Sequence, residues 1–505
     1  MSIKAEDLLQ VLREAARSPW LALAAAYVFL ALNVDFARDL RWHDGQRLAQ
    51  VVVLAMAGFL VLLPDRGREI AMVWTQWPNW VRSVMLLVLL LGLWSAAVAP
   101  LPRWALLECV TFILLLVLAI GVASAWRHPE ARREEALVCV FYAAALAYCV
   151  KAITVYVTMI AVGPAYDSGF AVEHLGFAVE ELFTGFSNVR FFSQVQTLLL
   201  PFLLLPAMCW ARTRLQVAML VVVPLIWWML LIASGTRGTW TAMLAAAVLA
   251  TACCGIAGRR WLRWQVFGLV AGLALYVLLI IVLPELLLAP EIRELASSVI
   301  SRRGEITSLR GREELWQLSL GLIVTHPWLG IGPMHFAQRL SEIGAHPHNS
   351  LLQFAVEWGL PVMFLLLAVT VIMGARWLLK VYRDQVQAEV GFSAMVQVAL
   401  LAAISGAAVQ SLVDGTLVMP VSQTTLALLV GWAMGRGMSM RMPTVKLRAY
   451  GIRFVAVAAA AGLLWAVAPE IGTLAQRELD HLKSLKPGPT PRLQTRYWTH
   501  GWIPD

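Results

Sequence analysis

Long apolar stretches recur along almost the whole of this 505-residue chain, and they constrain its fold more than any other feature. A helix needs roughly 20 apolar residues to cross a bilayer, where every backbone N–H and C=O must be hydrogen-bonded within the chain. The chain is therefore expected to be an all-α, polytopic helical membrane protein with about 12 to 13 transmembrane helices and one large outer loop. The predicted spans are 20–34, 48–64, 82–99, 104–125, 136–162, 192–211, 215–233, 239–257, 264–283, 350–374, 394–413, 419–435 and 450–468.

The composition agrees with this class and argues against nucleic-acid binding. Hydrophobic residues make up 60% of the chain and charged residues only 14%, against roughly 25% charged in soluble domains. The net charge of +9 comes from Lys and Arg in short loops, where basic residues set membrane orientation. The six cysteines all lie in apolar segments, so they indicate neither a disulfide framework nor a metal site.

The basic residues also predict how the chain is oriented. Short loops on the side of the N-terminus hold about 17 Lys and Arg against 6 on the other side, which favours an inside N-terminus. Residues 1–18 are expected to form a surface helix that is not a cleaved signal peptide. The predicted parts are N-terminal membrane helices (1–283), a large outer loop (284–349), C-terminal membrane helices (350–468) and an outer tail (469–505).

The sequence His346-Pro347-His348-Asn349 directly precedes the apolar segment 350–374. An imidazole can take a proton from a hydroxyl at neutral pH, so His348 is the candidate general base. Asn349 is expected to cap the helix, whose N-terminal N–H groups can hold an anion. His346 and His348 flank a proline, and we expect their side chains to point in different directions.

Further polar residues follow on the same segment. Asn349, Gln353 and Glu357 are spaced to share one helical face. At 1.5 Å per residue, Glu357 lies about 12 Å along the helix from Asn349. Glu357 is therefore predicted to be a buried polar strut, with a bend below it at Gly359-x-Pro361.

Two arginines mark short polar links on the outer side. Arg237 lies in Ser-Gly-Thr-Arg-Gly-Thr between two apolar spans, and its guanidinium is well matched to phosphate oxygens. The alternative is an arginine that snorkels to the interface. Arg190 precedes Gln194 where an acidic outer loop re-enters the membrane, and it either contacts phosphate or glycan or pairs with a carboxylate of that loop.

The large outer loop contains a predicted amphipathic helix over 310–325, which opens with Arg310 and Arg312. The Gly/Pro-rich stretch 326–333 is expected to turn the chain back to the membrane. A zinc site on His335, His346 and His348 is conceivable, but no ligand at helical spacing completes it. We therefore expect no metal and no cofactor.

Taken together, three motifs resemble the O-antigen ligase, O-antigen polymerase and protein O-oligosaccharyltransferase superfamily of GT-C-like membrane glycosyltransferases. They are Ser-x-x-Arg-Gly; Arg-x-Arg-Glu-x-x-Trp with His-Pro-Trp-Leu-Gly-Ile-Gly-Pro; and His-x-His-Asn-x-x-Leu-Gln-x-x-x-Glu-x-Gly, within 234–359. The resemblance implies a metal-independent, inverting transferase in the bacterial inner membrane that takes a glycan from undecaprenyl diphosphate at the periplasmic face.

The resemblance also implies roles for individual residues. His348 matches the essential histidine and Arg237 the arginine that contacts diphosphate. Further phosphate contacts and positioning roles for the acceptor or donor are expected at the following residues: Arg190, Arg310, Arg312, His346, Asn349, Gln194 and Asp414. On the predicted topology, the candidate catalytic and phosphate-binding residues all fall on one face of the membrane.

The acceptor stays open between lipid A–core, another lipid-linked glycan and a protein hydroxyl. The tail 469–505 is rich in Pro, Arg and aromatic residues, which suit sugar stacking or acceptor docking, or cap the loop. A transporter of lipid-linked glycans would need polar groups through the membrane. Lys151 and Glu357 are the charged residues noted inside the spans, which favours chemistry at the surface.

Overall fold

The computed structural model describes residues 18–36, 40–127, 131–162, 182–287, 309–338, 344–386, 390–437, 446–484, 495–501 and 503. Over these residues the chain is helical and contains no β-strand, as the apolar runs predicted. Residues 1–17, for which a surface helix was expected, lie outside the described part.

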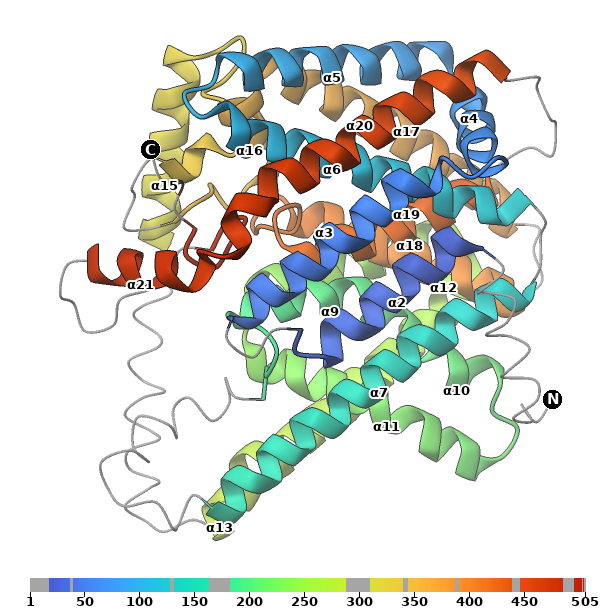
Figure 1. Ribbon diagram of the computed structural model, residues 1–505. Coiled ribbons are helices and arrows are strands. Elements are labelled where there is room, and N and C mark those ends of the chain that lie inside the picture. Colours follow the sequence, from blue (N-terminus) through green and yellow to red (C-terminus); the bar gives the residue numbers. More distant parts are fainter. Residues whose placement is uncertain are drawn as a thin grey trace.

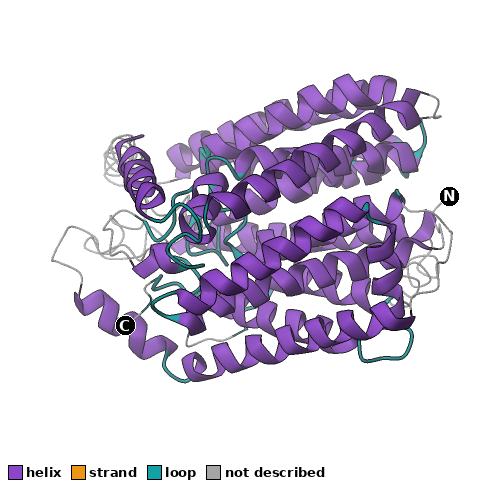
Figure 2. Cartoon of the chain, turned by 90° about the horizontal axis from the view of Figure 1, so that it is seen from above, coloured by secondary structure: helices purple, strands orange, loops and turns teal. Residues whose placement is uncertain are grey.

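The long helices run side by side between two ends of a bundle, and a dense group of loops collects at one end (Figures 1 and 2). The first half contains α2 (Pro19–Asn33), α3 (Trp42–Leu60), α4 (Arg66–Gln76), α5 (Asn79–Val98), α6 (Pro102–Ser124), α7 (Ala131–Val162), α9 (Val189–Leu203), α10 (Leu205–Cys209) and α11 (Arg214–Ser234). The second half contains α12 (Arg237–Tyr276), α13 (Leu283–Leu287), α15 (Leu309–Thr325), α16 (Ser350–Trp358), α17 (Leu360–Val386), α18 (Phe392–Gln410), α19 (Pro420–Arg436), α20 (Lys446–Ile471) and α21 (Leu474–Ser484).

Among the described residues, nine helices are long and apolar enough to cross a membrane. The other apolar segments that were predicted fall on α2, α3 and α19, which are shorter or carry more polar residues. The prediction of a multi-pass helical membrane protein is therefore confirmed. At the centre of the bundle, every residue of α9 from Phe191 to Leu203 is buried.

Helix α12 and the π-helical turns after it form one apolar stretch of 46 residues, Arg237–Val282. A straight helix of that length would extend about 69 Å, more than twice the roughly 30 Å of a bilayer core. The backbone instead reverses at Gly255 (φ 50°, ψ −119°), and a Cβ on Gly258 would overlap the Ala250 carbonyl. The stretch is therefore a hairpin of two arms, which agrees with the separate predictions 239–257 and 264–283.

The predicted span 350–374 is interrupted at Gly359, where a bend was expected, and it therefore forms two helices. Gly359 adopts φ 87° and separates the short helix α16 from α17, which supplies the membrane-spanning length. The 326–333 turn is hydrogen-bonded to both sides of this break. Ile331 N–H donates to Val356 O at 2.8 Å, and Leu360 N–H donates to Pro327 O at 2.9 Å. The Gly/Pro-rich turn therefore fixes the end of α16 as well as redirecting the chain.

Candidate functional site

The starts of three helices, α9, α12 and α15, each carry a candidate arginine. Figure 1 shows the arrangement of these helices. Asn188 caps α9 by accepting from Arg190 N–H at 2.9 Å, so Arg190 lies in the first turn. Gly235 (φ 59°) ends α11, and α12 begins at Arg237. Arg312 occupies the first turn of α15.

Buried hydrogen bonds join these helix ends to the C-terminal end of α18. Thr239 Oγ1 on α12 donates to Ser193 O on α9 at 3.2 Å. The same hydroxyl accepts from Gln410 Nε2, the last residue of α18, at 3.0 Å. Ser350 N–H, at the start of α16, donates to Ser411 O at 2.8 Å. The starts of α9, α12 and α16 are therefore held against the 411–419 turn that follows α18.

His348 adopts a left-handed backbone conformation, with φ 53°, which is uncommon for a residue other than glycine. Its N–H donates to His346 Nδ1 at 3.2 Å, and the two imidazole rings lie 4.1 Å apart between centroids. The expectation that the two side chains point apart is therefore wrong, because the positive φ folds His348 back beside His346.

The hydrogen bond to His346 Nδ1 fixes the protonation of that ring. A nitrogen that accepts cannot carry the proton, so neutral His346 holds it on Nε2. Burial, with His348, Arg496 and Arg190 nearby, lowers the pKa of His346 well below its usual value. His346 is therefore a neutral, buried support for His348. Gly415 packs against this ring, and a Cβ there would overlap it.

Asp414 is the acidic partner of His348. His348 Nδ1 lies 3.7 Å from Asp414 Oδ1, and Gly415 N–H donates to the same carboxylate at 2.8 Å. Burial acts to raise the pKa of Asp414, but His348 and the Gly415 N–H outweigh it and hold this pKa below its usual value. The carboxylate is therefore charged at neutral pH and available to stabilise an imidazolium.

Two of the buried polar atoms around Asp414 that form no hydrogen bond among the described residues belong to predicted site residues. They are His348 Nδ1 and Gln194 Nε2. Gln194 is held by its other end, because its Oε1 accepts from Ser422 Oγ at 3.0 Å. Both side chains also act on the Asp414 carboxylate and lower its pKa, so they are arranged around that carboxylate.

Arg190, Arg237 and Arg312 form a cluster of positive charge beside the pair. Burial, together with Arg190 and Arg237, lowers the pKa of Arg312, and Asp414 opposes that effect. Among the described residues, no carboxylate forms an ion pair with any of the three. Mutually repelling guanidiniums without ion-pair partners suit an anion with more than one negative charge.

Two predictions about arginines lie partly outside the described residues. The side chain of Arg310 is not in the described part, and neither are the acidic loop residues considered as partners of Arg190. Arg237 is exposed, and Arg190 and Arg312 are half-buried. A ligand can therefore reach the cluster from outside the bundle.

The N-terminus of α16 is not free to bind an anion, which corrects another expectation. Asn349 caps the helix as predicted, accepting from Leu351 N–H at 3.0 Å and from Leu352 N–H at 3.1 Å. Ser350 N–H is already bonded to Ser411 O. Anion binding at this place therefore depends on the arginine side chains.

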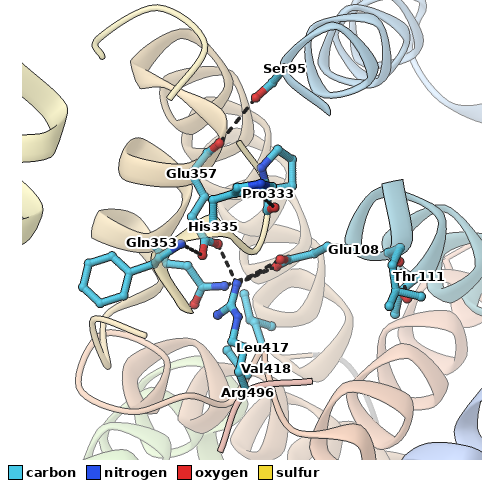
Figure 3. Close-up of polar contacts among 12 residues, drawn as sticks. Ser95, Glu108, Thr111, Pro333, His335, Gln353, Glu357, Leu417, Val418 and Arg496 are labelled. Carbon is cyan, nitrogen blue, oxygen red and sulfur yellow. Dashed lines mark hydrogen bonds and ion pairs between the residues drawn. The ribbon is translucent and has the colours of Figure 1, made fainter. Parts of the chain in front are cut away.

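Glu357 is fully buried, as predicted, but its partner was not foreseen (Figure 3). Arg496 Nη2 donates to Glu357 Oε2 at 2.6 Å and to both oxygens of Glu108 at 3.0 and 2.9 Å. Gln353 completes the cluster: with its amide oxygen facing the guanidinium, it accepts from Arg496 at 2.8 and 3.1 Å. Glu108 lies inside the predicted span 104–125, so the statement that Lys151 and Glu357 are the charges within the spans is incomplete.

The 495–501 segment is packed into the protein. Arg496, Tyr497 and Trp498 are 3%, 6% and 1% exposed. These side chains therefore do not offer an open platform for sugar stacking, and the alternative of a capping segment fits better. Pro491, Arg492 and Trp502 lie outside the described residues.

His335 does not join the other two histidines in a metal site. Its Nε2 accepts from Leu101 N–H at 3.0 Å, and its Nδ1 bonds to Pro333 O at 2.8 Å. Both ring nitrogens are therefore committed to the backbone. In the part of the chain that the structure describes, no group of three His, Cys, Asp or Glu side chains could hold a metal ion.

Comparison with known families identifies part of the chain. Residues 218–367 match the family model described as O-antigen ligase. The matched stretch contains Arg237, Arg312 and His348, whereas Arg190 and Asp414 lie outside it. No curated protein gives a significant match to the chain.

Proposed function

We propose that this chain belongs to the O-antigen ligase superfamily, whose family model matches residues 218–367, and that it transfers a glycan from undecaprenyl diphosphate to an acceptor hydroxyl. The superfamily consists of glycosyltransferase-like enzymes that act in the biosynthesis of O-antigen and lipopolysaccharide. We further propose that the reaction takes place at the periplasmic face of the bacterial inner membrane. The Lys and Arg bias of the loops supports that orientation.

The observation that carries the proposal is the His348–Asp414 pair, 3.7 Å apart, beside arginines that have no ion-pair partner among the described residues. An acid–base pair next to an anion site suits transfer from a diphosphate donor. His348 takes the proton of the acceptor hydroxyl, and the negative charge of Asp414 stabilises the imidazolium that forms.

The proposed step balances as a single displacement. The acceptor oxygen forms a bond to the anomeric carbon while the bond from that carbon to the diphosphate oxygen breaks. Attack from the side opposite the leaving group inverts the configuration. Undecaprenyl diphosphate departs with added negative charge, which Arg237, Arg190 and Arg312 neutralise. We propose that these guanidiniums supply the charge stabilisation for which a divalent cation would otherwise be needed.

The acceptor class decides between the members of the superfamily. Transfer to lipid A–core would make the protein a ligase, transfer to a second lipid-linked glycan a polymerase, and transfer to Ser or Thr a protein oligosaccharyltransferase. We favour the ligase-like reaction because the matched family model is described as O-antigen ligase.

Purified protein in proteoliposomes, supplied with an undecaprenyl-diphosphate-linked glycan, tests the proposal. Lipid A–core, a second lipid-linked glycan and a Ser/Thr peptide are offered in separate reactions, and the product is followed with a labelled donor. We expect glycan on lipid A–core and release of undecaprenyl diphosphate. Transfer to another acceptor alone would replace the ligase assignment, and no transfer to any acceptor would contradict the proposal.

A further inference from the structure

Two consecutive residues, Arg496 and Tyr497, contact helices α16 and α3, which connect them to the two loops that carry the proposed acid–base pair. On one side, the Arg496 guanidinium lies between Glu108 of α6 and Glu357 of α16 (Figure 3). Glu357 is near the end of the nine-residue helix α16, which begins directly after His348 and Asn349. A single short helix therefore joins Arg496 to His348.

On the other side, the same segment reaches the 411–419 turn through α3. Tyr497 O accepts from Arg47 Nε at 3.0 Å and lies 3.1 Å from His43 Nε2. Arg47 Nη2 then donates to Val418 O at 2.5 Å. Val418 belongs to the 411–419 turn, which also holds Asp414. Arg47 is 1% exposed, so this connection is made inside the protein.

The segment is fixed further along and lies within electrostatic reach of the histidine loop. Thr499 N–H donates to Asp44 Oδ1 at 2.6 Å, which holds the segment against the start of α3. Arg496 is also one of the charges that act on His346. The 495–501 segment is thus bonded to α16, which follows the His348 loop, and to α3, which contacts the 411–419 turn.

We propose that the 495–501 segment is a positioning element of the site. Arg496 holds α16 in place, and α16 in turn keeps His348 close enough to Asp414 for the two side chains to act as an acid–base pair. This proposal rests on the proposed function, since it assigns Arg496 a role in the same reaction. Arg496 is a positioning residue and touches no reacting atom. Without it, the buried carboxylates of Glu108 and Glu357 lose their shared cation, and α16 loses its ion pair to the 495–501 segment.

The charged and titratable groups around the His348–Asp414 pair come from several elements, and they bear on any pH measurement. His346 belongs to the same loop as His348, and the other charges are those of Arg190 on α9, Arg237 on α12 and Arg312 on α15. Replacing Arg496 leaves all of these residues in place.

The test compares Arg496→Gln with the matched control Arg103→Gln in the full-length protein. Arg103 pairs with the buried carboxylate of Glu470, which Arg477 also contacts, so the control removes a similar ion pair away from α16. Transfer is measured across pH, with kcat and KM for the donor. A misplacement of about 1 Å can cost on the order of 10²-fold, so we expect Arg496→Gln to lower kcat by up to that factor.

Three results distinguish positioning from loss of folded protein. For Arg496→Gln, KM for the donor should change less than twofold, and the acid limb of the kcat profile should move to lower pH, because Asp414 no longer stabilises the protonated base. Arg496→Lys, which keeps the charge but not the fork, should recover part of kcat. A fall in kcat with the acid limb unmoved would overturn the proposal.

Hydrogen exchange separates this proposal from the proposed function, because it requires no transfer activity. Exchange in 344–350 and 411–419 should rise in Arg496→Gln and remain at the wild-type level in Arg103→Gln. If Arg496→Gln does not fold, Glu357→Gln tests the same link, since it keeps the pair between Arg496 and Glu108. If a folded variant shows wild-type exchange in both segments, the proposal that the 495–501 segment positions the site is wrong, whatever the transfer activity.

Discussion

The His348 imidazole and the Asp414 carboxylate face each other across two loops, with Nδ1 and Oδ1 3.7 Å apart. His348 precedes α16, whereas Asp414 follows α18, and the bond from Ser350 N–H to Ser411 O joins the two loops. The separation is longer than a hydrogen bond, so the pair interacts through charge.

Replacement of Asp414 by Asn should reduce transfer at neutral pH by about tenfold or more, since the imidazolium loses its charge partner while the geometry is kept. The acid limb of the kcat profile should move to lower pH. Without the negative charge of Asp414 the protonated imidazole is less stable, so the base loses its proton at a lower pH. The measurement is transfer from pH 5 to 9 in proteoliposomes. An unchanged profile would remove Asp414 from the proposed chemistry.

Asp414 should also contribute to stability in a pH-dependent way. Its folded pKa lies below the usual 3.8, so the ionised form stabilises the fold above that pH, and the contribution is lost as pH falls through the folded pKa. The difference in thermal stability between wild-type protein and Asp414→Asn should therefore shrink on acidification from pH 6 to pH 3. A difference that grows towards acid would contradict the direction of this pKa shift.

His346 is expected to matter less than His348 and to act through it. His346→Ala removes the acceptor for His348 N–H and leaves the left-handed turn unsupported, so kcat should fall without the loss of all transfer. His346→Asn places a carbonyl oxygen near the position of Nδ1 and should recover part of the rate. Equal loss in the Ala variants of both histidines would contradict this division of roles.

Arg237→Lys should lose most transfer although it keeps the charge, because a planar fork can bind two phosphate oxygens and an ammonium cannot reproduce that geometry. Arg41→Lys is the matched control, since Arg41 is an exposed arginine that pairs with Glu478 outside the arginine cluster. Donor binding and kcat are measured for both variants. Wild-type activity of Arg237→Lys would reduce Arg237 to an interfacial anchor.

The orientation of the protein is tested by reporter fusions after residues 345 and 385. Helix α17, Leu360–Val386, separates the two positions and is long enough to span the bilayer. A reporter active only in the periplasm should be active after residue 345 and silent after residue 385. The reverse pattern would put the site on the cytoplasmic side and overturn the proposed donor.

The sequence could predict the parts of this structure that depend on local patterns. The length of the apolar runs predicted the spans. The 237–282 stretch was predicted as two spans because an arginine-rich link follows Gly255, where the backbone reverses. Topology alone grouped Arg190, Arg237, His348 and Asp414 on one face. The structure brings these residues together at one end of the bundle, although their chemical roles stay predictions.

What the sequence missed depends on contacts between distant segments. Arg496 lies 388 positions from Glu108 and 139 from Glu357, and a lone charge in an apolar run does not reveal which helix packs beside it. The left-handed conformation of His348 depends on the acceptor that His346 provides. Likewise, the Ser411 carbonyl accepts from the first N–H of α16 only because α18 ends beside the start of α16.

The central claim is that His348 is the base of a transfer reaction that needs no metal. The most direct measurement compares wild-type protein with His348→Ala in proteoliposomes, with and without EDTA, while thermal stability is checked. A general base contributes about 10²–10⁴-fold, so His348→Ala should show no detectable transfer while remaining folded, and EDTA should leave the wild-type rate unchanged. Wild-type rates in His348→Ala, or loss of wild-type transfer in EDTA, would contradict the account.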